Sequence, residues 1–268
     1  MAALGGRNAL VTGAGSGIGR AIAAALVERG VHVTLADIDD EAVTQLAGTL
    51  GPLAFPLKLD VTDHLAVDAL LKSMPPDFRP IDILINNAGH DVGGRTNFAR
   101  GPAVDWTSIL DVNLTGMVRV TRAVVPEMIE RNSGDIVNMS SISALRLVPE
   151  TAAYTTSKAG VGAFSDGLRA NLAETAIRVT EVLPGPYADQ YHSQASPSRS
   201  GAGKGLFRPS QNYLDPEDIA RMVVLALEQA SLYANRPTLR PTRQSVVSRS
   251  PASPACRPLP RATAPVTG

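Results

Sequence analysis

The sequence predicts an α/β protein built on one parallel β-sheet that is covered by helices. Short apolar runs alternate with longer segments whose apolar residues recur at helical spacing, and this alternation continues without a break to residue 185. Strands separated by helices of this length imply right-handed β-α-β crossovers and therefore a parallel sheet. Aromatic residues are few, so the core is filled by Ala, Val, Leu and Ile, which suits a sheet buried on both faces.

Each element follows from a local pattern. The apolar runs predict strands at residues 8–11, 31–36, 53–59, 81–85, 135–139 and 177–183. The helical spacing predicts helices at residues 18–29, 41–50, 64–73, 106–131 and 152–174. Gly30 ends the first helix, Asn132-Ser133-Gly134 ends the long helix, and Pro184-Gly185 ends the last of these strands.

The C-terminal part of the chain departs from this alternation. Residues 187–212 are polar and rich in Ser and Gly, too long for an ordinary connection, and therefore either a functional lid or disordered. Asp215-Pro216-Glu217 caps a helix that runs to about residue 229, and residues 238–240 form a last edge strand. We expect one catalytic domain over residues 1–244. The tail, residues 245–268, has too few large apolar residues to stay ordered, and its Cys256 is interpreted as a bystander.

The composition excludes several classes of function. The chain has 25 Lys and Arg against 25 Asp and Glu, so a zero net charge gives no long-range attraction for nucleic acid or an anionic membrane. It has no apolar stretch of about 18 residues that would span a membrane, and no apolar signal region at its start. Its single cysteine forms no internal disulfide, and the sequence shows no metal site. We expect a cytoplasmic protein.

A glycine turn lies between the first strand and the first helix. Residues 12–19 follow the spacing G-x-x-x-G-x-G through Gly13, Gly17 and Gly19, with Ser16 and Ile18 between them. Glycines allow the backbone to approach phosphates, and the free N–H groups and dipole of the helix favour an anion. The turn therefore predicts a site for the pyrophosphate of a dinucleotide cofactor. A purely structural glycine turn is the alternative.

Asp37 ends the second strand, 18 residues after Gly19, close to the spacing at which a carboxylate binds the adenosine ribose hydroxyls. A carboxylate there repels the 2′-phosphate of NADP, and no Arg or Lys lies between residues 35 and 45 to receive one. The sequence therefore favours NAD over NADP. The alternative is that Asp37 merely caps the helix that follows it, as Asp39 or Asp40 would.

Tyr154 and Lys158 are four residues apart in a predicted helix and therefore share a face. A nearby cation, helped by an oxidised nicotinamide ring, favours the phenolate and lowers a Tyr pKa that is ordinarily near ~10. Ser141, 13 residues before Tyr154, ends a predicted strand and can donate to a substrate oxygen. Ser140 and Ser143 are its rivals, and a solvated helix face explains most isolated Tyr-x-x-x-Lys pairs.

Taken together and in this order, these motifs closely resemble the short-chain dehydrogenase/reductase family over roughly residues 5–244. The resemblance rests on residues 12–19, Asp60-Val61, Asn86-Asn87-Ala88-Gly89, Asn113, Ser141, Tyr154, Lys158 and Pro184-Gly185. It implies a Rossmann-like, doubly wound and mostly parallel seven-stranded sheet with helices on both faces. It also places the active site at the carboxyl ends of the strands.

The resemblance implies a role for each matching residue. Tyr154 exchanges the alcohol proton, Ser141 orients the reacting oxygen, and Asn113 kinks its helix and holds a water that continues a proton relay to Lys158. The cofactor-binding residues that it implies, with those of the glycine turn, are Gly13, Ser16, Gly17, Ile18, Gly19, Asp37, Asp60, Val61, Asn87, Ala88, Gly89, Tyr154, Lys158, Pro184, Gly185 and Tyr187. Asn86 and Asn87 are turn formers first. Asp189 replaces the Thr that often binds the nicotinamide carboxamide, so that contact is an open question.

Substrate specificity is less visible in the sequence. The segments expected to surround the substrate carry His90, Arg146, Tyr187 and Tyr191. Arg146 and Arg95 could bind an anionic group, or could reach solvent instead. The ending at residues 240–244 resembles relatives that act on small 3-hydroxy acids. Small residues in the helix after Ser141 allow close approach of a second helix, in a homodimer or homotetramer or within the chain itself.

Three functions therefore compete. The first is an NAD-dependent dehydrogenase that oxidises a small polar secondary alcohol, polyol or hydroxy acid to the carbonyl. The second is an NADPH-dependent 3-oxoacyl or carbonyl reductase. The third is a catalytically silent NAD-sensing binding protein, a class that usually lacks the Tyr or the Lys.

Overall fold

The structure, a computed structural model, describes residues 4–91, 102–146, 151–186, 214–229 and 237–239. Its strands form a seven-stranded sheet in the order β3-β2-β1-β4-β5-β6-β7. The strands are β1 (Asn8–Thr12), β2 (His32–Asp37), β3 (Ala54–Lys58), β4 (Ile83–Asn86), β5 (Gly134–Met139), β6 (Ile177–Pro184) and β7 (Thr238–Leu239). Every pairing is parallel. Six strands make the main sheet, and β7 adds two residues beside the end of β6.

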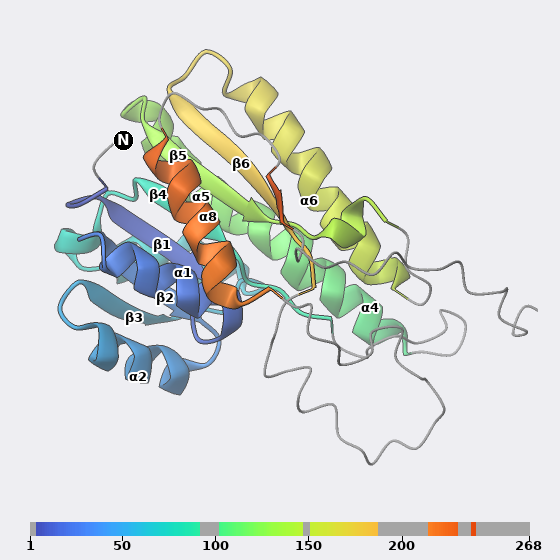
Figure 1. Cartoon of the computed structure of the whole chain (residues 1–268), viewed down its shortest axis with the longest axis horizontal. Coiled ribbons are helices and arrows are strands. Elements are labelled where there is room, and N and C mark those ends of the chain that lie inside the picture. The colour runs from blue at the N-terminus through green and yellow to red at the C-terminus, as the bar shows by residue number, and fades with distance from the viewer. Residues whose placement is uncertain (1–3, 92–101, 147–150, 187–213, 230–236, 240–268) are drawn as a thin grey trace, which may run out of the picture.

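Helices cover both faces of the sheet (Figure 1). The α-helices are α1 (Gly17–Val27), α2 (Asp40–Leu50), α3 (His64–Asp68), α4 (Ala103–Leu110), α5 (Met117–Glu130), α6 (Ala152–Asn171) and α8 (Pro216–Glu228). The short helices are η1 (Leu70–Ser73), η2 (Pro76–Phe78), η3 (Asp111–Gly116) and η4 (Ile142–Ala144). These elements confirm the predicted fold class, a doubly wound parallel sheet.

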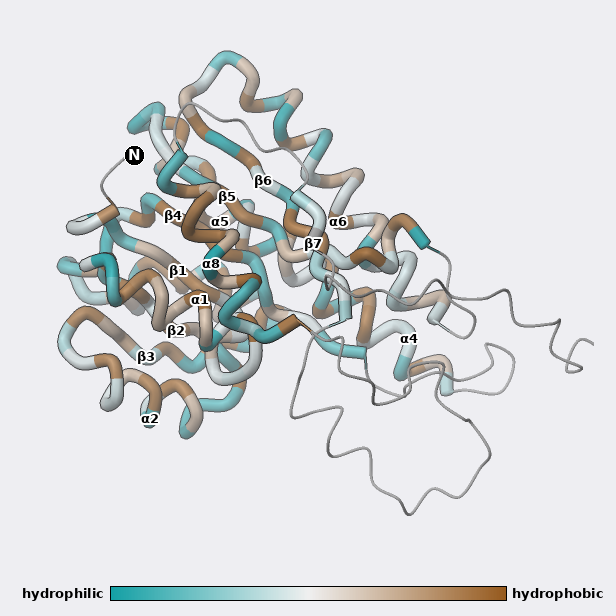
Figure 2. Tube along the Cα trace, viewed as in Figure 1, coloured by the Kyte–Doolittle hydropathy of each residue, from teal (hydrophilic) through white to brown (hydrophobic). Residues whose placement is uncertain are grey.

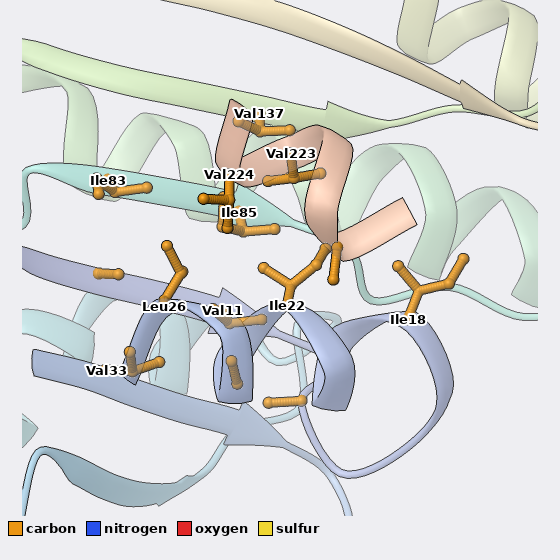
Figure 3. Packing of buried hydrophobic residues seen from close by; sticks show 14 of the residues in the cluster. Val11, Ile18, Ile22, Leu26, Val33, Ile83, Ile85, Val137, Val223 and Val224 are labelled. Atoms are coloured by element: carbon orange, nitrogen blue, oxygen red, sulfur yellow. The ribbon is translucent and has the colours of Figure 1, made fainter. Parts of the chain in front are cut away.

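Two apolar clusters hold the layers together. On one face, α1 contributes Ile18, Ile22 and Leu26, and α8 contributes Val223 and Val224, against side chains of β1, β2, β4 and β5 (Figure 3). On the other face, α5 and the end of α6 pack against the sheet through a second cluster. The helices alternate between hydrophobic and hydrophilic residues along their length (Figure 2), as expected where only one side of each helix is buried.

The order of the strands places the candidate site. The chain winds from β1 outward to β3 on one side and then crosses to β4 on the other side of β1. Ligands of open parallel sheets bind outside the carboxyl ends of the strands where this direction reverses. The segments after β1 and β4, which carry the glycine turn and Asn87 to Gly89, therefore lie next to one another.

The long helix predicted over residues 106–131 is the main difference in secondary structure. It consists of α4, the π-helical turn η3 and α5, with Asn113 buried inside η3. The helix thus changes its hydrogen-bonding pattern where the kink was expected. The helix predicted over residues 64–73 is divided in the same way, into α3 and the 3₁₀ turn η1.

Other predictions concern residues outside the described part of the chain. These are the lid at residues 187–212 and the tail at residues 245–268. Among the described residues, no helix is long and apolar enough to cross a membrane.

Candidate active site

The glycine turn packs too tightly for side chains at two of its positions. A Cβ atom on Gly19 would lie 2.0 Å from the carbonyl oxygen of Gly13. Gly13 has a φ of 65°, and a Cβ there would lie 2.9 Å from the Cα of Ala88. Ser16 precedes α1 without a side-chain capping bond, so its hydroxyl does not occupy the first N–H groups of the helix. The turn can therefore present backbone N–H groups to an anion.

Residues 87–89 join the glycine turn to the catalytic residues. The amide Nδ2 of Asn87 donates to the carbonyl oxygens of Thr12 and Gly13 at 3.0 and 3.1 Å. On the other side, a Cβ on Gly89 would lie 3.5 Å from Lys158 Nζ and 3.0 Å from Asn113 Oδ1. The phosphate-binding turn and the lysine therefore flank the same short segment. Asn87 follows β4 without a regular turn, and its side chain instead braces the glycine turn.

Asn86 differs from its predicted role as a turn former. It is buried in the last position of β4, and its Nδ2 donates to Thr121 Oγ1 at 2.9 Å and Asn138 Oδ1 at 2.8 Å. Asn138 in turn donates to Ser165 Oγ of α6 at 2.9 Å. Asn86 therefore begins a buried chain of hydrogen bonds from β4 to the helix that carries the catalytic residues. This cross-strand contact is long-range, so turn chemistry could not predict it.

Asp37 lies beside the glycine turn, as the spacing predicts. Its carboxylate accepts from the backbone N–H of Gly15 at 2.9 Å and from that of Asp39 at 3.0 Å. Asp39, rather than Asp37, caps α2 by accepting from Ala42 N at 3.0 Å. The capping alternative for Asp37 is therefore wrong, and its carboxylate faces the turn where a ribose is expected.

The opposite wall of this region is the turn at residues 60–62. Asp60 Oδ1 accepts from the N–H and the hydroxyl of Thr62 at 2.8 and 2.7 Å, so one of its oxygens is used within the turn. Val61 is 7% exposed and packs into the second apolar cluster. The turn thus combines a half-buried carboxylate with a buried apolar side chain.

Two further hydrogen bonds attach helix α6 to the end of β5. Lys158 Nζ donates to the carbonyl oxygen of Met139 at 2.9 Å, and Ser140 Oγ donates to the carbonyl oxygen of Lys158 at 3.0 Å. Lys158 Nζ also lies 5.8 Å from the centroid of the Tyr154 ring. These contacts bring the two predicted catalytic residues of α6 to the carboxyl end of the sheet.

The contacts of Ser141 differ from those of the two alternative serines, Ser140 and Ser143. Ser140 is occupied by the bond to α6, and the backbone N–H of Ser143 donates to Ser141 Oγ at 3.1 Å. A side-chain hydrogen bond between Ser141 and Tyr154 lowers the pKa of the phenol. Of the three serines, Ser141 is therefore the one whose hydroxyl meets Tyr154.

The pKa of Tyr154 in the chain alone is raised, whereas the prediction of a lowered pKa included an oxidised nicotinamide ring. Burial raises it above the ordinary value, and the carboxylate of Asp91 raises it further, while Ser141 opposes both. Burial also lowers the pKa of Lys158 to about 8, although Asp91 partly offsets this effect. The sequence pattern shows the spacing of the two groups, but it cannot show how strongly both are desolvated. The same residues therefore favour a protonated phenol when no cofactor ring is bound.

Asn113 fixes the segment that follows Gly89. Its Oδ1 accepts from the N–H of His90 at 2.8 Å, and its Nδ2 donates to the carbonyl oxygen of His90 at 3.0 Å. The same Nδ2 donates to Ser157 Oγ at 3.1 Å. The His90 ring bonds to Ser108 of α4, with 3.1 Å between Nε2 and Oγ. Burial lowers the pKa of His90. His90 thus helps to hold this wall of the site in place. A contact between His90 and the substrate stays a prediction.

Asp91 acts on the catalytic pair, although no sequence motif predicts this effect. It is exposed, and its charge acts on both Tyr154 and Lys158. A carboxylate after the Asn-Asn-Ala-Gly run was visible, but only the fold brings it within electrostatic reach of residues more than sixty positions later. Among the remaining predictions, Pro184 and Gly185 are buried at the end of β6, Arg146 is exposed, and Tyr187 and Tyr191 lie outside the described residues.

This arrangement fits a dinucleotide. The glycine turn and the start of α1 would hold the phosphates, Asp37 and the turn at residues 60–62 would flank the adenosine, and Lys158 and Tyr154 would meet the nicotinamide half. Within the described residues, no group of three or more His, Cys, Asp or Glu side chains could hold a metal ion.

The chain is similar to known oxidoreductases. The family model for short chain dehydrogenases matches residues 7–199. An uncharacterised oxidoreductase of Staphylococcus aureus strain MW2 is 35% identical over 243 residues, which cover 90% of this chain and 100% of the relative. A probable NADP-dependent dehydrogenase of Haemophilus influenzae is 34% identical over 243 residues, which cover 90% of this chain and 96% of the relative.

Solved structures are similar over nearly the whole chain. The closed form of a serine dehydrogenase complexed with NADP+ has a TM-score of 0.83 and 30% identity, covering 91% of this chain and 99% of that one. Serine dehydrogenase from Escherichia coli has a TM-score of 0.77 and 31% identity, covering 88% and 99%. An actinorhodin polyketide ketoreductase with NADPH has a TM-score of 0.78 and 30% identity, covering 90% and 98%.

Proposed function

This chain belongs to the short-chain dehydrogenase family of oxidoreductases, and on that basis we propose that it oxidises a small polar secondary alcohol, polyol or hydroxy acid with NAD. The observation that supports this proposal most is the meeting of Ser141, Tyr154 and Lys158 at the carboxyl end of β5. A silent cofactor-binding protein would not need a buried lysine beside a half-buried phenol, because both groups are costly to desolvate.

The proposed mechanism assigns one task to each group. A bound nicotinamide supplies the hydride chemistry. Ser141 Oγ donates to the reacting oxygen and orients it, and Tyr154 Oη takes the alcohol proton, or returns it in the reverse direction. Lys158, held by Met139 at 2.9 Å, would bind the nicotinamide ribose and place a positive charge beside the phenol. Asn113 keeps Gly89 and His90 against Lys158, so that this wall of the site does not shift.

Asp91 is expected to shift the pH dependence of this step. Its carboxylate raises the pKa of Tyr154, so Asp91→Asn should lower that pKa and make the phenolate available at lower pH. The acid limb of the kcat/KM profile for oxidation should move to lower pH. Asp68→Asn, at the exposed end of α3, is the control and should leave the profile in place. A shift to higher pH in Asp91→Asn would contradict this assignment.

The preference for NAD rests on Asp37. Its carboxylate lies beside the N–H of Gly15 and would repel a 2′-phosphate. The similar structures with NADP+ and NADPH, and the probable NADP-dependent relative, support the alternative that this chain is an NADPH-dependent 3-oxoacyl or carbonyl reductase. The two proposals differ in the preferred cofactor, which can be measured directly.

We expect the wild-type protein to use NAD at least about tenfold better than NADP in kcat/KM, and Asp37→Asn to narrow this ratio. The asparagine keeps a hydrogen-bond acceptor for the glycine turn and removes only the charge. Asp40→Asn, at the exposed start of α2, is the control for a general change of charge. A wild-type preference for NADPH would decide for the reductase.

The substrate class is tested with a panel of alcohols and ketones, followed by NADH or NADPH absorbance. Small hydroxy acids, polyols and hydroxy amino acids such as serine belong in the panel, because the similar structures include serine dehydrogenases. Turnover of several polar secondary alcohols with NAD supports the proposal. Tight NAD binding without any turnover would favour the silent binding protein instead.

The assembly state is also a proposal. Ala159 and Ala163 are exposed on α6 and could meet a second copy, whereas Gly160 packs against Leu114 and Gly162 is buried within the chain. The two alanines are therefore available for contact with a second copy, and the two glycines serve packing within the chain. A homodimer or homotetramer in the cytoplasm, with neither nucleic acid nor membrane as a partner, stays a prediction.

A further inference from the structure

The π-helical turn η3 contacts the catalytic helix α6 on one side. Asn113 of η3 donates to Ser157 Oγ at 3.1 Å, and Ser157 donates to the carbonyl oxygen of Tyr154 at 2.7 Å. One turn further along α6, a Cβ on Gly160 would lie 2.8 Å from Cδ2 of Leu114. The absence of a side chain at position 160 therefore lets η3 and α6 approach closely. These contacts fix η3 relative to the helix that carries Tyr154 and Lys158.

The same turn contacts the opposite wall of the site through Gly116. A Cβ on Gly116 would lie 2.6 Å from Cγ2 of Val61, 3.0 Å from its Cβ and 3.1 Å from its carbonyl oxygen. Gly116 is buried, and Val61 has a β-branched side chain with little rotational freedom. A methyl group at position 116 could therefore be accommodated only if Val61 moved together with its backbone.

A second contact supports this wall from the next turn of the helix. Arg119 Nη1 donates to the carbonyl oxygen of Thr62 at 3.3 Å. Asp60 holds Thr62 from within the turn, at 2.7 and 2.8 Å. Residues 60–62 therefore contact the segment from Gly116 to Arg119, and Asn113, three residues before Gly116 in η3, holds the catalytic side.

We propose that η3 is a spacer that sets the distance between the wall at Val61 and the catalytic helix α6, and that Gly116 is its positioning residue for cofactor binding. This inference rests on the proposed function, which assigns the Val61 wall to the adenosine half of the cofactor. Any side chain at position 116 would push Val61 into the volume that the adenosine needs. Tyr154 and Lys158 would keep their places, because α6 is held by separate contacts.

The test compares cofactor binding with turnover in Gly116→Ala. The KM for the preferred dinucleotide and the dissociation constant for ADP-ribose, measured by calorimetry, should each rise about tenfold, the size expected for overpacking by one methyl group. The kcat at saturating dinucleotide should stay within about twofold, because the reacting groups do not move. A merely structural defect would lower kcat and the fraction of active protein instead. Measuring KM and kcat with NAD and with NADP separately makes the test of Gly116 independent of which cofactor the protein prefers.

Three further variants sharpen the comparison. Val61→Ala combined with Gly116→Ala should recover part of the lost affinity, because it removes the 2.6 Å overlap with Cγ2 but leaves the contacts with the Cβ and the carbonyl oxygen of residue 61. Gly167→Ala, in α6 with no atom within 4 Å of the added methyl group, is the matched control and should change neither constant. Arg119→Met removes the bond to Thr62 without steric overlap, so it tests the same wall if Gly116→Ala does not fold. It should raise both constants by a few-fold.

The outcomes separate this inference from the proposed function. Unchanged ADP-ribose binding in Gly116→Ala, or a fall in kcat with KM unchanged, would overturn the spacer role. If Gly116→Ala does not fold, unchanged constants in Arg119→Met would overturn it as well. ADP-ribose binding is measured without any substrate, so a protein that turned over no alcohol would refute the proposed function while still testing Gly116.

Discussion

Tyr154→Phe is expected to remove nearly all interconversion of alcohol and carbonyl while the protein stays folded and binds its cofactor. The substitution deletes only the hydroxyl group, which is the proton acceptor in the proposed mechanism, and keeps the ring that packs beside Lys158. Positioned acid–base groups commonly contribute 10²–10⁴-fold, so kcat should fall by about that factor. Steady-state turnover and NADH fluorescence titration measure the two effects separately.

The control for this prediction is Thr156→Val, which removes an exposed hydroxyl from the same turn of α6. It should leave kcat within about twofold, since surface substitutions of this kind change little. Undiminished oxidation in Tyr154→Phe would refute the assignment of Tyr154 as the acid/base. Loss of NADH binding together with turnover would show that the phenol holds the cofactor or the fold rather than the proton.

Gly19→Ala is expected to have the second largest effect, this time on cofactor binding. The added methyl carbon would lie 2.0 Å from the carbonyl oxygen of Gly13 and 2.5 Å from Asn87 Nδ2, so the glycine turn would have to deform. Both the approach of the backbone to the phosphates and the bond from Asn87 to Gly13 depend on that geometry. We expect affinity for the dinucleotide to fall by about 100-fold or more, or roughly 3 kcal/mol.

A matched control is available in the neighbouring helix. Gly48→Ala in α2 is also a glycine-to-alanine change within a helix, but its methyl group would meet no atom within 4 Å. It should leave cofactor affinity unchanged and stabilise the fold by up to about 1 kcal/mol, because alanine favours helix over glycine. Thermal unfolding and calorimetric titration of both variants distinguish a damaged turn from a general helix effect. Equal affinities for the two variants would contradict the role of Gly19.

The parallel sheet and the candidate catalytic residues could be predicted from local patterns. Alternation of apolar runs with helical spacing depends on the backbone geometry of single elements, and it predicts the strands up to β6 and the helices around them. The glycine turn, Asp37 at the end of β2 and the pair Tyr154 and Lys158 are likewise visible as residue types at set spacings. Their roles in the reaction stay predictions until the variants above are measured.

Contacts between distant residues, by contrast, were decided by the tertiary structure. Turn chemistry assigned Asn86 to a turn, but the pairing of β4 with β5 buries it against Asn138. Spacing favoured Ser141 over Ser140 and Ser143, and the packing of α6 on β5 adds that the Ser140 hydroxyl is bonded to the backbone of Lys158. The role of Gly116 depends on Val61, which is remote in the sequence and adjacent in space.

The electrostatics of the site also depends partly on local sequence and partly on the tertiary structure. The sequence correctly places a cation one helical turn from a phenol, yet the sign of the pKa shift of Tyr154 depends on burial and on Asp91. Periodicity and turn formation arise from neighbours along the chain, so they can be predicted from sequence. Desolvation and close approach arise where separate segments meet, so only the folded chain determines them.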